Sequence, residues 1–216
     1  MVKNVLLAMV VLIAVTQESF GEMVFSNGIT DSAPNLFNPF TIGQAVDTNL
    51  TASGIGRGVG ISGNAGANRY NATGFATTLA DSITGNDYFT FTLTSHTGFQ
   101  LNLTSFAYTG QASATGPVAF SFRSSIDSFA NTIGSATVVG TTISLSDPSF
   151  QGLKSATEFR FYAGGGTGGT YSINEFGFSG SVTAVPEPTS IALVSLMCCT
   201  GFVAAFRRRI AKSKIA

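Results

Sequence analysis

The chain has 216 residues, of which 44% are hydrophobic and only 10% are charged. Soluble globular proteins carry about 25% charged residues, so this chain is unusually poor in charge. Its formal net charge is zero, which excludes the basic domain of a nucleic-acid-binding protein. Because 19 Phe residues and the other hydrophobic side chains can fill a core, an intrinsically disordered chain is also excluded.

The N-terminal segment, residues 1–21, has the features of a secretory signal peptide. Lys3 precedes an uncharged hydrophobic run over residues 5–15. This run is too short to span a bilayer, which takes about 20 residues, but it matches the hydrophobic region of a signal peptide. Small residues at Ser19 and Gly21 allow cleavage after Gly21. We therefore predict an N-terminal signal helix and export of the remaining chain; a buried core helix is the alternative.

A second hydrophobic segment, residues 189–206, lies near the C-terminus and carries no charge. Its length predicts one transmembrane helix. A basic tail over residues 207–216 follows, and it begins with Arg207, Arg208 and Arg209. Positive residues beside a span stay in the cytoplasm, so the helix is expected to lie N-out and C-in in the inner membrane. Residues 22–185, with five basic and nine acidic side chains, would then be the external domain.

The order of these segments resembles a known sorting signal. Pro186, Glu187 and Pro188 stand directly before the span, and the arginine cluster follows it. With the signal peptide, residues 186–216 resemble the PEP-CTERM family, whose tail is also catalogued as the ice-binding protein C-terminal domain. The resemblance implies that an exosortase-type membrane enzyme recognises the Pro-Glu-Pro motif and removes the span. It also implies that the rest of the protein reaches the cell surface or the extracellular polysaccharide matrix.

Short runs of alternating hydrophobic and polar residues in the external domain predict β-strands. Residues 88–94, for example, alternate phenylalanine or leucine with threonine, and similar runs occur at 99–104, 118–123, 158–162 and 171–182. The alternation shifts near Ser105 and at Asn174–Glu175, which predicts a β-bulge at each place. No stretch of the domain shows the 3.6-residue period of a helix. We therefore expect an all-β domain, an antiparallel β-sandwich or jelly roll, in which Val118, Phe120 and Phe122 face inward.

The less regular residues 27–80 are expected to form long ordered loops with a few short strands. Within the domain, residues 56–60, 85–91 and 120–125 resemble an ectodomain that recurs in PEP-CTERM proteins. In those proteins the last strand often carries an Ile-Asp-Asn segment, which here reads Ile173-Asn174-Glu175. Carboxylate and carbonyl oxygens at loop spacing are the ligands that calcium prefers. A structural calcium ion therefore has two candidate sites: Asp81, Asn86 and Asp87, or Asn174 and Glu175.

No catalytic constellation is recognisable in the sequence. His96 is the only histidine, and because no G-x-S-x-G motif accompanies it, we expect a solvated turn residue. Cys198 and Cys199 both lie in the predicted span, so the domain has neither disulfides nor zinc-binding thiols. Nine acidic residues leave a glycoside hydrolase open, but nothing in the sequence places a pair of them across a cleft. We predict a protein that is not an enzyme and that has no cofactor other than structural calcium.

These observations lead to an exported surface or matrix protein with a structural or adhesive role in exopolysaccharide. Its expected partners are the processing enzyme, the polysaccharide matrix and, through the C-terminal helix, the membrane. A lectin-like carbohydrate-binding module is the first alternative, and it requires Tyr70, Tyr108 or Tyr162 to be exposed beside polar residues. An ice-binding surface is a weaker alternative, because it requires regular threonine rows on neighbouring strands and an uncharged face.

Overall fold

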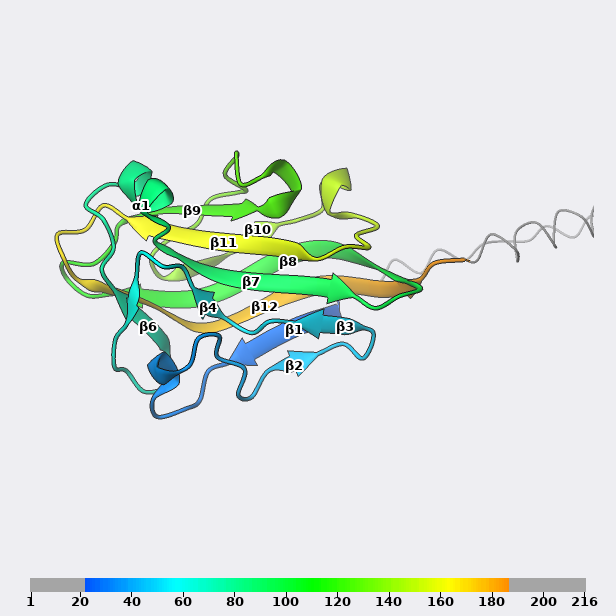
Figure 1. Ribbon diagram of the computed structural model, residues 1–216, viewed down its shortest axis with the longest axis horizontal. Helices are drawn as coiled ribbons and strands as arrows, with labels where there is room; N and C mark the ends of the chain where they lie inside the picture. Colours follow the sequence, from blue (N-terminus) through cyan, green and yellow to red (C-terminus); the bar gives the residue numbers. More distant parts are fainter. Residues whose placement is uncertain (1–21, 187–216) are drawn as a thin grey trace, which may run out of the picture.

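The computed structural model describes residues 22–186, which form two antiparallel sheets packed face to face (Figure 1). The large sheet has five strands in the order β10 (Gly140–Ser144), β8 (Phe99–Ala112), β12 (Thr170–Ala184), β1 (Glu22–Gly28) and β2 (Ala45–Val46). Two further strands extend it, since β6 (Tyr70–Thr73) pairs with β12 and β5 (Ser62–Gly63) pairs with β6. The all-β sandwich expected from the alternating pattern is thus confirmed.

The small sheet lies in front of the large one in Figure 1. It has the order β3 (Leu50–Ala52), β7 (Tyr88–Ser95), β11 (Thr157–Gly164) and β9 (Ala119–Ser124), and β4 (Gly56–Arg57) also pairs with β7. Within residues 22–186, one α-helix, α1 (Leu79–Gly85), contacts β11 and β9. The connections of this part of the chain contain three short 3-10 turns, namely η1 (Pro34–Leu36), η2 (Ser125–Asp127) and η3 (Pro148–Phe150).

Aromatic side chains fill the space between the sheets. Phe91 of β7 contacts Phe176 of β12 with ring centroids 4.7 Å apart, and Phe159 of β11 contacts Phe178 of β12 at 5.1 Å. Ten phenylalanines in this part of the chain are almost completely buried: Phe25, Phe40, Phe89, Phe91, Phe106, Phe122, Phe159, Phe161, Phe176 and Phe178. Burying a phenylalanine contributes about 1.5–3 kcal/mol, so these rings replace the disulfides that the domain lacks.

Both predicted bulges are present where β8 and β12 pair. The register shifts between Ser179 and Gly180, opposite Ser105 and Leu103, and again between Ile173 and Glu175. Each bulge leaves one residue without a direct partner and thereby changes which residues face the core. Because of the first shift, Leu103 and Phe106 both point inward, although one has an odd and the other an even number.

Two expectations about this domain were wrong. Val118 does not face inward, because it lies before β9 and is 73% exposed, whereas Phe120 is partly buried and packs against the core as expected. A helix was not expected, yet α1 forms because Thr78 caps it. The Thr78 hydroxyl oxygen accepts a hydrogen bond from the Asp81 N–H at 3.1 Å, and Asn86 ends the helix in the left-handed conformation. The Thr-x-x-Asp pattern of a helix start was the signal that would have revealed it.

Candidate functional site

The end of the domain that leads into the Pro-Glu-Pro motif is built by the last residues of β12. Ala184 pairs with Phe99, and the Val185 N–H donates a hydrogen bond to the Gly98 carbonyl oxygen at 2.8 Å. Pro186, the first motif residue, follows directly and is exposed. The motif therefore begins one residue after the last backbone hydrogen bond, without a spacer.

The N-terminal strand begins at the same end of the sandwich. Glu22 pairs with Gly180, which is four residues before Ala184. At about 3.3 Å per strand residue, this places the start of β1 roughly 13 Å from the end of β12. Figure 1 shows β1 beginning at the end of the molecule where β12 terminates. The predicted signal peptide and the predicted span thus both join the domain at this end.

A hollow of about 410 Å³ lies beside Pro186, between the β7–β8 turn and Lys154. His96 lies in this turn, as expected, and its Nε2 atom is 3.0 Å from the Thr51 hydroxyl oxygen. Thr51 is exposed on β3, so the histidine contacts a surface hydroxyl. No carboxylate lies within hydrogen-bonding distance of His96 among residues 22–186, and a catalytic histidine would need such an orienting partner.

Several residues of the sorting interpretation lie outside the described range. Glu187, Pro188, the span 189–206 and the arginines Arg207, Arg208 and Arg209 follow it, and the cleavage residue Gly21 precedes it. Within residues 22–186, no helix is long and apolar enough to cross a membrane.

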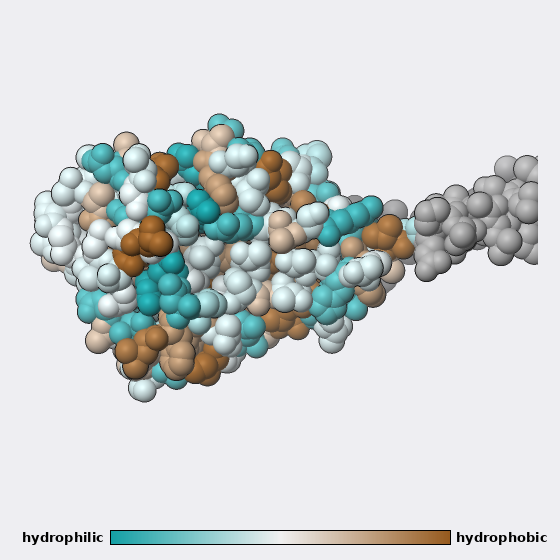
Figure 2. Space-filling model, in the orientation of Figure 1, coloured by the Kyte–Doolittle hydropathy of each residue, from teal (hydrophilic) through white to brown (hydrophobic). Residues whose placement is uncertain are grey.

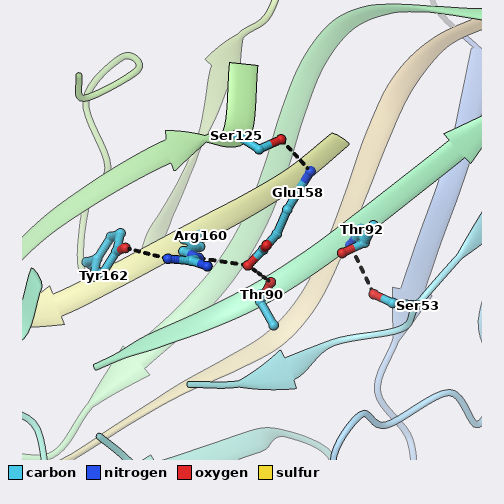
Figure 3. A network of polar contacts seen from close by, with 7 residues as sticks. All are labelled: Ser53, Thr90, Thr92, Ser125, Glu158, Arg160 and Tyr162. Atoms are coloured by element: carbon cyan, nitrogen blue, oxygen red, sulfur yellow. Dashed lines mark hydrogen bonds and ion pairs between the residues drawn. The ribbon is translucent and has the colours of Figure 1, made fainter. Parts of the chain in front are cut away.

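A polar cluster covers the outer face of the small sheet (Figure 3). Glu158 of β11 accepts hydrogen bonds at its Oε1 atom from Arg160 Nε at 2.7 Å and from the Thr90 hydroxyl at 3.1 Å. Arg160 Nη1 also reaches the Tyr162 hydroxyl at 3.5 Å, and the Glu158 N–H donates to Ser125 Oγ at 3.0 Å. The side chains of this cluster thus bind one another.

Aromatic rings hold Arg160 in place. Its guanidinium carbon lies 3.8 Å from the ring centroid of Phe129 and 4.5 Å from that of Tyr88. Burial lowers the pKa of the Arg160 guanidinium, but its hydrogen bonds with Glu158 and Tyr162 raise this pKa above the usual value, so the group stays charged. Burial raises the pKa of the Tyr88 hydroxyl. Phe129 reaches this place from a loop in which it and Ser128 both have positive φ. The alternation over residues 158–162 places Glu158 and Arg160 on the face opposite Phe159 and Phe161, but it does not indicate these contacts.

The threonines of β7 alternate with its buried residues, as the sequence predicted. Thr90, Thr92 and Thr94 point outward, but Thr90 binds Glu158, and the facing strand β11 presents Glu158 and Arg160 instead of threonine. Figure 2 shows pale, weakly polar residues over this face, with scattered hydrophilic and hydrophobic ones. The face therefore carries charge and only one threonine row, which removes the argument for an ice-binding surface on this sheet.

The tyrosines that the lectin-like alternative requires to be exposed are buried. Tyr70, Tyr108 and Tyr162 are at most 4% exposed. The Tyr70 hydroxyl donates to the Phe37 carbonyl oxygen at 2.9 Å, and the Tyr108 hydroxyl donates to that of Thr137 at 2.6 Å. Burial raises the pKa of both hydroxyls. The rings of Tyr70 and Tyr108 belong to the core, because their hydroxyl groups find backbone partners at its edge. Tyr162 is instead buried on the outer face of the small sheet, where Arg160 reaches its hydroxyl.

The two candidate calcium sites are differently placed. Asp81 and Asp87 lie at opposite ends of α1, where Asp81 Oδ2 accepts a hydrogen bond from the Thr78 hydroxyl and Asp87 Oδ2 accepts one from the Ala76 N–H. Asn174 lies at the β12 bulge, where its Oδ1 atom accepts a hydrogen bond from the Ser172 hydroxyl, and Glu175 is exposed. In the described part of the chain, no group of three or more His, Cys, Asp or Glu side chains is arranged to hold a metal ion.

Comparison with protein-family models, curated proteins and solved structures finds no significant match to this chain.

Proposed function

We propose that this chain is an exported, non-enzymatic protein of the cell surface or extracellular matrix, sorted through a PEP-CTERM tail. In this proposal residues 1–21 are a cleaved signal peptide, and residues 189–206 are a transmembrane helix that holds the precursor in the inner membrane. An exosortase-type enzyme acts at Pro186, Glu187 and Pro188, and the domain of residues 22–185 then joins the polysaccharide matrix.

The position of the first and last strands of the domain supports this proposal most directly. Since β1 starts and β12 ends at the same end of the sandwich, the signal peptide that directs export and the span that anchors the precursor both join the domain at the end that would face the membrane. Most large hydrophobic side chains of the domain pack between the two sheets, so its core forms without a membrane contact. A structural or adhesive role fits a surface on which polar side chains pair with one another, as Glu158, Arg160 and Thr90 do.

The intact mass of the protein recovered from the surface of its host tests the proposal. We expect a mass that lacks residues 1–21 and the region after about Pro186. The triple variant Pro186→Ala, Glu187→Ala, Pro188→Ala should retain the span, whereas Thr183→Ala, an exposed position just upstream, should be processed like the natural chain. A surface protein that keeps residues 189–206 in the natural sequence would overturn the sorting proposal.

A further inference from the structure

The outer face of the large sheet is hollowed across its strands. Ala107 of β8 pairs with Thr142 of β10 on one side and with Gly177 of β12 on the other, and Gly177 pairs with Ser26 of β1. Ala107, Gly177 and Ser26 all have small side chains or none, so this row lies lower than the neighbouring row of Thr109 and Glu175. The result is a groove of about 510 Å³ that runs across the strands.

Larger residues border this groove. Thr109 and Glu175, which pair with each other in the neighbouring row, form one wall and are both exposed. Met23 lies over Gly177, where any Cβ atom would collide with its sulfur, and it is 54% exposed. Val139, 70% exposed, lines the groove near β10. The groove thus offers aliphatic C–H surface together with polar groups.

The polar side chains in the groove have no partners among the described residues. Ser26, Thr109, Thr142 and Glu175 form no side-chain hydrogen bond or ion pair within residues 22–186. On the opposite face of the sandwich, Glu158, Arg160 and Thr90 bind one another. Several unpaired donors and acceptors that converge on one hollow are the usual arrangement of a binding site.

We propose that this groove binds a segment of an uncharged polysaccharide. Its hydroxyls donate and accept hydrogen bonds as sugar hydroxyls require, and the Glu175 carboxylate accepts the strongest of them. Met23, Ala107 and Val139 supply apolar contact for the C–H face of a sugar ring. Glu175 is the only charged residue in the lining, so an anionic polymer would be repelled.

The geometry also argues against an extended peptide as the occupant. A peptide that adds a strand needs free backbone groups at a sheet edge. The floor of this groove consists of three paired strands, β8, β12 and β1, whose backbone groups already bind one another. Binding in this groove rests on the proposed function, because the matrix location would supply the polysaccharide.

Binding of defined polysaccharides to the purified protein tests this inference. The probes are uncharged glucans, galactan, mannan and xylan, the neutral fraction of the host's exopolysaccharide, and an anionic polyuronate as comparison. We expect one or more neutral polymers to bind with an affinity that is the same at low and high salt. Ala107→Leu, which fills the floor, should weaken this binding at least tenfold, and Glu175→Gln should weaken it severalfold.

Thr94→Leu is the control, because it places the same leucine side chain on the outer face of the small sheet, away from the groove. It should bind like the natural protein. If Ala107→Leu lowers the unfolding midpoint, Thr142→Tyr, at an exposed position of β10, blocks the groove from its edge instead.

The inference would be overturned if no neutral polymer bound, or if both groove variants bound as tightly as the natural protein. It would also be overturned if only the polyuronate bound and its binding weakened with salt. A dimer that Ala107→Leu dissociates would overturn it too, because the groove would then be an interface between copies. If the surface form retains its span, the binding measurements use the full chain purified in detergent. A retained span with intact glycan binding would refute the sorting proposal but not the groove.

Discussion

The rings of Phe106 and Phe122 stack between the two sheets, with centroids 4.5 Å apart and planes 7° from parallel. Phe106 comes from β8 of the large sheet and Phe122 from β9 of the small sheet, and both are fully buried. The ring centroid of Phe178 of β12 lies 4.6 Å from that of Phe106. Phe106 thus packs at the center of the sandwich, against rings from both sheets.

Replacing Phe106 should therefore destabilise the whole domain. Phe106→Ala removes a ring that neighbouring aromatics enclose, and such truncations cost about 3–5 kcal/mol. Phe37→Ala removes the same atoms from a ring that is 44% exposed, and it should cost less than half as much. Urea unfolding followed by circular dichroism measures both changes. Equal losses for the two variants would contradict the central role of Phe106.

The tight packing of strands at the bulge makes Gly180 sensitive. A Cβ atom at Gly180 would collide with the Asn102 carbonyl oxygen and would lie 3.0 Å from the Leu103 Cα atom. Because both are backbone atoms, Gly180→Ala should lower the free energy of unfolding by about 1–3 kcal/mol. Gly28→Ala is the control, since no heavy atom lies within 4 Å of its Cβ position, and it should be neutral or slightly stabilising. Equal denaturant midpoints for the two variants would contradict the close contact at Gly180.

On the outer face of the small sheet, we expect stacking to contribute more than the ion pair. The side chains of Arg160 and Glu158 are 22% and 30% exposed, and pairs of this kind contribute about 0–1 kcal/mol. Glu158→Gln should therefore cost at most about 1 kcal/mol. Arg160→Ala also removes the contacts with Phe129 and Tyr88, so its cost should be about 2 kcal/mol and should persist in high salt. Denaturant unfolding at low and high ionic strength measures both variants. If high salt abolished the loss of stability caused by Arg160→Ala, the ion pair and not the stacking would be the main contribution.

Three buried tyrosines should make the fold sensitive to alkali. Burial raises the pKa of Tyr70, Tyr108 and Tyr171 above the usual value of 10.0. The unfolded chain then loses these protons at a lower pH than the folded chain, so stability falls as the pH rises above 10. Their contribution is fully present below that pH.

The tyrosinate absorbance of the protein measures this effect without interference, because the chain has no Trp. We expect part of the tyrosinate signal to appear only together with the loss of circular dichroism, above pH 10. Complete ionisation of all five tyrosines near pH 10 in a protein that remains folded would contradict the burial of these hydroxyls.

The sequence alone was sufficient to predict the all-β class, most of the inward-facing residues and both bulges. These features follow from local alternation, since a strand with one buried face must place hydrophobic residues at every second position. Where the alternation shifts, as at Ser105 and Asn174, an extra residue must be accommodated. The Thr78 cap of α1 was also visible locally, although it was not recognised.

Only the tertiary structure decided which surfaces can bind. Tyr70, Tyr108 and Tyr162 have amphipathic side chains that suit either a core edge or a sugar platform. The packing of the two sheets buries Tyr70 and Tyr108, and neighbouring side chains on the outer face of the small sheet cover Tyr162. The groove arises from Thr142, Ala107, Gly177 and Ser26, which lie on four strands that are distant in sequence. Strand order and register bring them together, and these depend on long-range pairing that local periodicity does not specify.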